Sequence, residues 1–261
     1  MRDIVKASRR PRRFARATGG GFPRLSGSVA HGSRCPASPR HALLAESLGK
    51  PSLWVIISAP WYEVLDCLSA RGVAATFFVS AKDILNEPQR ALVRRAKDAG
   101  HRIGNHTYSH SVILGESADP ETPAREIGAA QEVLAELAEA DRLYRPFGGG
   151  GVIGPTLLSR AAIDYLCEGG YTCVLWNSVP RDWEDPTGWP ERAMAQIARH
   201  DWTLVVLHDI ATGAMKQLPR FFDLLRREDL EVVQDFPPDC VPIRRGKIVG
   251  PVDHLASGAP G

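Results

Sequence analysis

Residues 75–105 read ATFFVSAKDILNEPQRALVRRAKDAGHRIGN, and this stretch decides the fold class. The run Ala75–Ser80 is rich in β-branched and aromatic residues, which favours a strand. Pro88 to Ala99 carries apolar residues at helical spacing, and Gly100 suits the position just past a helix end. His101–Asn105 then has the length and composition of a second strand. The stretch therefore predicts a strand–helix–strand unit of an α/β protein.

The same alternation of extended and helical patterns continues on both sides of this unit. Further helices are expected at 61–72, 119–140, 155–168, 189–200 and 219–228, and further strands at 54–58, 143–147, 171–177, 202–208 and 231–236. The later strands are apolar almost throughout, which fits a parallel sheet buried on both faces. With seven strands in all, the pattern predicts a barrel-like parallel α/β fold.

The first fifty residues differ in composition from the rest of the chain. They hold 11 Lys and Arg against 2 Asp and Glu, whereas the remainder holds 21 against 28. Gly, Ser and Pro are frequent and no periodicity is present, so residues 1–50 are predicted to be a disordered basic segment. We hypothesise that this segment is not the native start of the domain. The domain itself is expected at 51–241, followed by an irregular tail at 242–261.

Composition also bounds the compartment and the partners. No apolar run approaches the roughly 18 residues of a membrane span, and no secretory apolar stretch follows the arginine pairs near the start of the chain. The five cysteines show no C-x-x-C spacing, so neither a disulfide framework nor a zinc–cysteine site is predicted. We therefore expect a cytoplasmic protein rather than a secreted one, and we expect it to have no membrane partner. A transit peptide or a nucleic-acid-binding tail is the alternative interpretation of the basic segment, although no aromatic residues interleave with its arginines.

Chemically capable side chains recur where an apolar run gives way to a loop, which is where catalytic groups commonly lie. His106 and His110 are four residues apart and would share a face on a helical turn. Two neutral imidazoles so placed can bind one divalent metal ion. The alternative is a pair on a surface loop, because this spacing also arises by chance.

A second candidate group lies late in the chain. His208 ends an apolar strand, and histidine is the usual proton donor near neutral pH, so we expect it to be a general acid. Asp182 is expected beside it, to stabilise the protonated imidazole. The alternatives are a core histidine satisfied by a carbonyl and an aspartate that caps a turn before Pro186. His101 precedes its strand rather than ending it, so a structural role is expected there.

The motifs that carry these side chains occur in a fixed order: ATFFV at 75–79, AGHRIGNH at 99–106, RPF at 145–147, DW at 182–183 and LHD at 207–209. In this order they resemble the polysaccharide deacetylase family, the metal-dependent chitooligosaccharide-deacetylase-like hydrolases, from about Trp54 to Val241. The resemblance implies a distorted, incomplete (β/α) barrel with its site at the carboxyl ends of the strands. It also implies removal of acyl groups, acetyl above all, from amino sugars or related amides, with a divalent metal, foremost zinc.

The resemblance also assigns roles to single residues. It implies that Arg145 orients the general base and that Asp182 pairs with His208. If the base is absent from this chain, the alternative is that Arg145 binds a substrate oxygen or carboxylate. Trp183 is expected to form an apolar wall against the acyl group; the alternative is that it is simply a core residue. The expected site consists of catalytic His208, Asp182 and Arg145, metal ligands His106 and His110, and substrate-binding Trp183, Phe147 and Asn177.

One motif of that family is not recognisable here. The family pattern begins with a strand ending T-F-D-D-G, whose aspartates supply the general base and the metal carboxylate. In this chain Leu53–Pro60 reads LWVIISAP, and the nearest register puts Ser58 and Ala59 in their places. Glu63 and Asp66 follow in a predicted helix and are expected to be surface charges. Two functions therefore stay open: an active deacetylase, and a catalytically impaired relative that binds carbohydrate or amide ligands.

Overall fold

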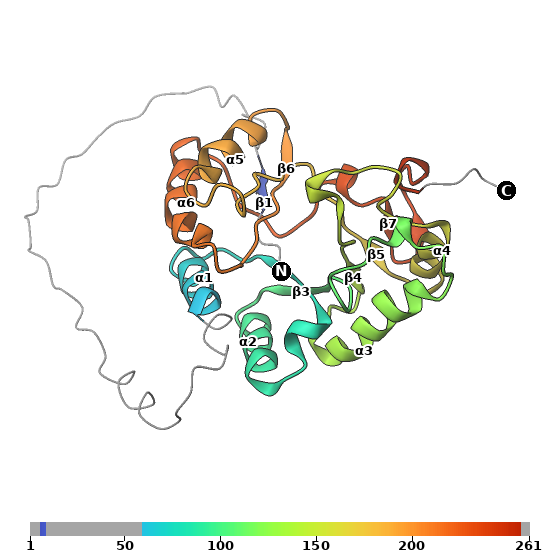
Figure 1. Cartoon of the computed structure of the whole chain (residues 1–261). Helices are drawn as coiled ribbons and strands as arrows, with labels where there is room; N and C mark the ends of the chain where they lie inside the picture. The colour runs from blue at the N-terminus through green and yellow to red at the C-terminus, as the bar shows by residue number, and fades with distance from the viewer. Residues whose placement is uncertain (1–5, 9–58, 257–261) are drawn as a thin grey trace, which may run out of the picture. The chain divides into compact units, whose positions relative to one another are not determined.

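The computed structural model describes residues 6–8 and 59–256, and all of these belong to one of the two units into which the chain divides. Its α-helices are α1 (Ala59–Ser69), α2 (Glu87–Asp98), α3 (Ala129–Leu134), α4 (Arg160–Glu168), α5 (Trp189–Ile197) and α6 (Leu218–Arg227). Its strands are β1 (Lys6–Ser8), β2 (Thr76–Val79), β3 (Arg102–Asn105), β4 (Leu143–Tyr144), β5 (Thr172–Cys173), β6 (Trp202–Leu204), β7 (Ile243–Arg244) and β8 (Lys247–Ile248). Within this unit the helices lie outside the strands (Figure 1).

The main sheet has the order β2-β3-β4-β5-β7-β8. Strands β2 to β5 run parallel, whereas β7 and β8 are antiparallel to their neighbours. Strand β6 pairs antiparallel with β1, and a parallel bridge between Ser178 and Val205 joins the segments that follow β5 and β6. The prediction of an α/β fold with a mostly parallel sheet is confirmed. The arrangement differs from the expected seven parallel strands because the sheet ends in an antiparallel pair.

The structure corrects two predictions about the end of the chain. The strand expected at 231–236 is absent from the structure, which has only a bridge residue at Glu231. Within the tail predicted to be irregular, β7 and β8 instead form a hairpin around Arg245 and Gly246. These two residues have φ values of 50° and 76°, and two successive positive φ angles are typical of the tight turns that join hairpin strands.

The long helix expected at 119–140 is also corrected. The structure has a π-helix at Ala124–Gly128, then α3, then a 3₁₀ turn at Ala135–Leu137. The side-chain amide of Asn105 donates to the Ile127 carbonyl at 2.9 Å, which gives this carbonyl a partner outside the helix. Insertion of a side chain into a helical hydrogen-bond pattern is a common cause of such irregularities.

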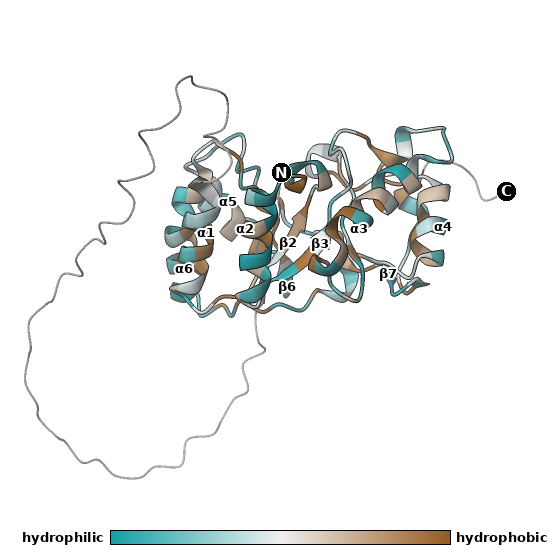
Figure 2. Ribbon diagram, turned by 90° about the horizontal axis from the view of Figure 1, so that it is seen from below, coloured by the Kyte–Doolittle hydropathy of each residue, from teal (hydrophilic) through white to brown (hydrophobic). Residues whose placement is uncertain are grey.

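Two apolar clusters hold the elements together. The first joins α1, β2, α2, α5 and α6, with ring contacts between Trp61 and Phe77 at 4.9 Å and between Trp189 and Phe221 at 5.0 Å. The second packs β4 and β5 against α4 and the end of the described chain. Figure 2 shows hydrophobic residues on the strands and hydrophilic ones on the outer helix faces. The clusters fix the strands whose carboxyl ends carry the candidate site.

Several predictions about the start of the chain fall largely outside the described residues. Within residues 1–50 the structure describes β1 alone, so the disordered basic segment stays a prediction. The strand expected at 54–58 and Ser58 are not described, and Ala59 begins α1. Glu63 and Asp66 are exposed on α1, as expected, and Asp66 pairs with Arg95 at 2.8 Å. No helix in the described part of the chain has the length and apolar character to cross a membrane.

Candidate functional site

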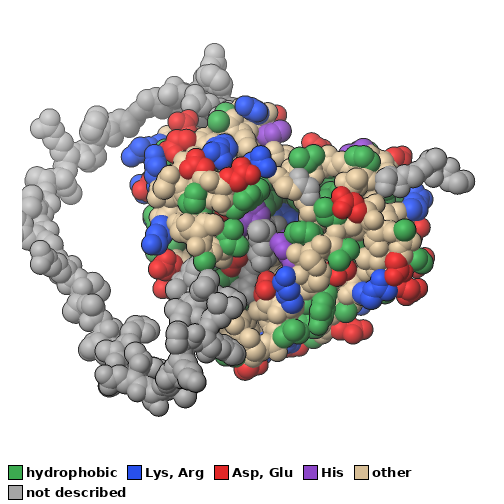
Figure 3. Space-filling view, in the orientation of Figure 1, with side chains coloured by type: hydrophobic (Ala, Val, Ile, Leu, Met, Phe, Trp, Pro, Cys, Tyr) green, Lys and Arg blue, Asp and Glu red, His purple; other side chains and the backbone are tan. Residues whose placement is uncertain are grey.

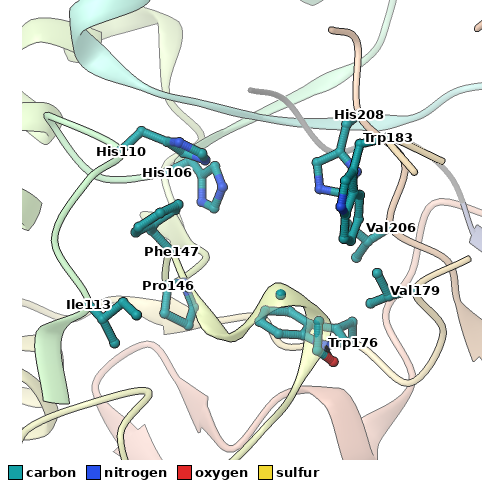
Figure 4. A pocket seen from close by; sticks show the side chains of 13 residues that line it. His106, His110, Ile113, Pro146, Phe147, Trp176, Val179, Trp183, Val206 and His208 are labelled. Atoms are coloured by element: carbon teal, nitrogen blue, oxygen red, sulfur yellow. Dashed lines mark hydrogen bonds between the residues drawn. The ribbon is translucent and has the colours of Figure 1, made fainter. Parts of the chain in front are cut away.

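A pocket of about 350 Å³ lies at the carboxyl ends of the central strands. His106 and His110 line one side of it, and Trp183 and His208 line the other (Figure 4). On the molecular surface, histidine side chains lie inside a hollow (Figure 3). Most of the remaining lining is apolar or glycine, including Phe147 from the loop after β4. The structure thus brings the two predicted histidine groups to a single pocket.

The loop after β3 presents the first two histidines. His106 is 4 % exposed, and its Nδ1 donates to the Arg145 carbonyl at 2.9 Å, which leaves Nε2 with a lone pair. The rings of His106 and His110 are 4.8 Å apart. The expected helical turn is wrong, because Thr107 and His110 have φ values of 66° and 51°. An irregular loop, rather than a helix face, brings these imidazoles together.

Asp182 and His208 form a tightly held pair on the opposite side. The Asp182 carboxylate is fully buried; its Oδ1 accepts from His208 Nδ1 and its Oδ2 from the His208 backbone amide, both at 2.8 Å. The ring of Trp183 packs edge-on against the imidazole at 4.6 Å. These contacts fix the imidazole with Nδ1 protonated. The predicted pairing is therefore present, while its catalytic role stays a prediction.

Arg145 lies in the interior of the protein. It is 2 % exposed, its Nε and Nη2 donate to the carbonyls of Val174 and Leu175 at 3.2 and 3.3 Å, and its guanidinium lies 4.2 Å above the Phe78 ring. Arg145 does not line the pocket, although Phe147, two residues further on, does. This placement fits a residue that orients other groups better than one that binds substrate.

The predicted substrate-binding residues separate into two sets. Trp183 and Phe147 line the pocket, and the Phe147 ring is 4.2 Å from that of His110. Asn177 lies outside this pocket, because its side-chain amide donates to the Trp202 carbonyl at 3.0 Å and accepts from the Leu204 amide at 2.7 Å. These bonds make Asn177 a link between the segment after β5 and strand β6, while its role as a substrate contact stays a prediction.

Two functional candidates were missed by sequence reasoning. Trp176 lines the pocket, with its indole nitrogen bound to the Gly151 carbonyl at 3.0 Å. Because side chains alternate along an extended segment, Trp176 faces the pocket and its neighbour Asn177 does not. Glu126 is a buried carboxylate whose Oε2 accepts from two backbone amides of the histidine loop. Its only sequence signal is an acidic residue within an apolar helical stripe.

The donor set can be tested against a divalent metal ion. His106 has the arrangement common for metal-binding histidines, in which one ring nitrogen donates to a carbonyl and the other faces outward. His110 adds a second imidazole to the same pocket. In the ranges that the structure describes, no group of three or more His, Cys, Asp or Glu could hold an ion. The described residues therefore fit two ligand positions of such an ion and provide no carboxylate for a third.

Comparison with known proteins connects these residues to a family. The polysaccharide deacetylase family model matches residues 56–166. A peptidoglycan-N-acetylglucosamine deacetylase of Bacillus cereus is 28% identical over 151 residues, which are 56% of this chain and 65% of that protein. The Bacillus subtilis peptidoglycan-N-acetylmuramic acid deacetylase PdaA is 31% identical over 123 residues, 47% of this chain and 43% of that protein. The chain thus spans less than two thirds of the length of these relatives.

Solved structures share the fold. A CE4 family pseudoenzyme from Bacillus anthracis matches with a TM-score of 0.54 and 17% identity, over 65% of this chain and 56% of that one. A mutant of the same protein, described as having restored enzymatic activity, matches with a TM-score of 0.55 and 17% identity, over 65% of this chain and 58% of that one. At 17% identity, this similarity is evidence for a shared fold only. The family model over residues 56–166 and the sequence relatives support a polysaccharide deacetylase assignment for that part of the chain.

Proposed function

We propose that this protein is a metal-dependent hydrolase that removes acetyl or related acyl groups from amino sugars or similar amides. The observation that carries the proposal is the Asp182–His208 pair, which faces His106 and His110 across one pocket (Figure 4). The match of residues 56–166 to the polysaccharide deacetylase family model supports it, as do the sugar-polymer substrates named for the relatives. In this proposal the described sheet is part of an incomplete (β/α) barrel whose strands carry the site at their carboxyl ends.

Hydrolysis of an amide requires attack by water on the carbonyl carbon and breakage of the C–N bond. A divalent ion, when bound, lowers the pKa of a water and polarises the acyl carbonyl. His106 and His110 would hold such an ion on their side of the pocket, with zinc as the first choice for imidazole ligands. The Arg145 carbonyl fixes the His106 ring by accepting from Nδ1. This contact directs the Nε2 lone pair away from the backbone.

His208 is placed to handle the proton of the leaving group. With Nδ1–H bound to Asp182, a proton on Nε2 makes the ring an imidazolium, which the buried carboxylate stabilises. As the C–N bond breaks, Nε2 gives this proton to the leaving nitrogen. The amine departs neutral, and the acyl group leaves as a carboxylate that carries the oxygen of the attacking water. The two protons of that water pass to solvent, and His208 regains one proton from solvent. Trp183 and Phe147 provide apolar walls that restrict water around the acyl group.

A second candidate function is a catalytically impaired relative that binds carbohydrate or amide ligands. It is favoured by one observation, namely that no carboxylate joins His106 and His110 among the described residues. Ser58 and Ala59 occupy the nearest register for the missing aspartates. In this reading the pocket holds its ligand without supplying a general base. A similarly folded pseudoenzyme shows that this fold also occurs without activity.

One experiment separates the two functions. Purified protein is titrated with Zn²⁺ by calorimetry, and N-acetylglucosamine oligomers are then added while acetate and oligomer binding are both measured. The proposed hydrolase releases acetate only with metal, and a chelator abolishes the release. The impaired relative binds the oligomer without releasing acetate at any metal concentration. A protein that neither binds the oligomer nor releases acetate contradicts both functions.

A further inference from the structure

The loop that carries His106 and His110 has a backbone that its own residues disfavour. Thr107 and His110 have φ values of 66° and 51°, in the left-handed region. For a β-branched residue such as Thr107 this conformation is an outlier. It persists only where surrounding contacts over-determine it. The question is therefore which contacts hold the loop.

Side-chain oxygens satisfy four consecutive backbone amides in this loop, those of residues 107–110. Two of these bonds are local. The Thr107 amide donates to Asn105 Oδ1 at 3.0 Å, and the His110 amide donates to Thr107 Oγ1 at 3.2 Å. Both acceptors belong to the same short segment, so they can tighten the loop but cannot anchor it to the rest of the protein.

The two amides between them bind a carboxylate from another part of the chain. Tyr108 and Ser109 donate to Oε2 of Glu126 at 3.2 and 3.0 Å. Glu126 is only 7 % exposed. A buried carboxylate is costly unless donors meet its charge, and bonds from amides to a charged acceptor are stronger than neutral ones. The loop and the carboxylate therefore stabilise each other.

The local helix geometry brings Glu126 to the loop. Glu126 lies in the π-helix Ala124–Gly128, and Asn105 Nδ2 donates to the carbonyl of the next residue, Ile127, at 2.9 Å. The neighbouring residues Glu126 and Ile127 thus form hydrogen bonds with the loop after β3 and with the last residue of β3, respectively. A π-helix turn is a frequent device at functional sites, because it shifts side chains relative to a regular helix.

We propose that Glu126 is a positioning residue that fixes this loop so that His106 and His110 face the same pocket, with their rings 4.8 Å apart. Glu126 does not line the pocket, so it acts through the loop rather than on a ligand. The inference rests on the proposed function, because it takes metal binding as the task of the two imidazoles. Its loop-ordering part can be tested independently of that task.

The test compares Glu126→Ala with the matched control Glu132→Ala, an exposed glutamate on the following helix. Zn²⁺ affinity is measured by calorimetry, and amide hydrogen exchange is measured at Tyr108 and Ser109. Loss of an outer partner of metal ligands commonly weakens binding about 10- to 100-fold, and we expect this range for Glu126→Ala. The two loop amides should exchange at least about tenfold faster, while β3 amides and the control remain as in the wild type. Glu126→Gln keeps one acceptor oxygen. Its zinc affinity and its loop-amide exchange rates should lie between those of Glu126→Ala and those of the control.

The inference is overturned if Glu126→Ala keeps wild-type zinc affinity and loop exchange. If Glu126→Ala does not fold, Glu126→Gln decides: intermediate values support the inference, and wild-type values overturn it. If the wild type itself binds no zinc, the metal part of the proposed function fails. The positioning role is then tested without zinc, by comparing Glu126→Ala with the wild type. The quantities compared are the loop-amide exchange rates and the side-chain NMR signals of His106 and His110. Unchanged exchange and signals in Glu126→Ala would overturn it.

Discussion

At the scale of single residues, His101 links protonation to stability. Its Nδ1 accepts the Ala75 backbone amide at 3.0 Å, so this contact requires the nitrogen to be unprotonated. Burial lowers the pKa of His101 below its ordinary value. The unfolded chain, with a histidine pKa near 6.5, therefore binds the proton first as the pH falls. The stability that neutral His101 contributes to the folded state is complete above about pH 6.5. It is lost as the pH falls toward the lowered pKa of His101 in the folded state.

We predict that replacing His101 by Gln weakens this pH dependence, because a glutamine oxygen can accept the same amide without titrating. The free energy of unfolding is measured by urea denaturation between pH 5 and 7.5. The wild type should lose stability toward pH 5 more steeply than the variant. Parallel curves for the two proteins would show that His101 does not couple protonation to folding.

At the scale of elements, the sequence predicted best where local pattern suffices. The helix after β2 and strand β3 were placed within one residue of their bounds, because apolar spacing and Gly100 are local signals. The histidine loop was predicted wrongly as a helical turn, because its backbone depends on Glu126, which is distant in sequence. The π-helix around Glu126 was missed for the same reason, since it depends on contacts with Asn105.

The β7–β8 hairpin allows a direct test at this scale. Gly246 has a φ of 76°, and a Cβ there would collide with the Cys167 main-chain oxygen. Gly213 has a similar φ of 82° but open space around its Cβ position. Gly213→Ala should therefore cost about 1–2 kcal/mol from backbone strain alone. Gly246→Ala should cost about 1–3 kcal/mol more, the range typical of overpacking. Equal free energies of unfolding for the two variants would show that the hairpin shifts without cost.

At the scale of the whole molecule, residues far apart in the chain meet at one pocket. The family resemblance carried by the order of motifs implied a site at the carboxyl ends of the strands, where the loops after β3 and β4 meet those that carry Asp182 and His208. Which side chains face inward was harder to predict. Asn177 was predicted to contact substrate and Trp176 was not, although Trp176 lines the pocket, because the alternation along that segment depends on its pairing with β6. The antiparallel end of the sheet was missed because its strands are only two residues long.

The central claim is that His208 provides the proton for the leaving nitrogen in metal-dependent deacetylation. The measurement is the initial rate of acetate release from an N-acetylglucosamine oligomer, with Zn²⁺ present, for the wild type and for His208→Ala. Loss of a positioned general acid should lower the rate about 10²- to 10⁴-fold, while zinc affinity should stay unchanged because His106 and His110 are intact. Wild-type protein that releases no acetate, or a His208→Ala rate equal to that of the wild type, would contradict the account.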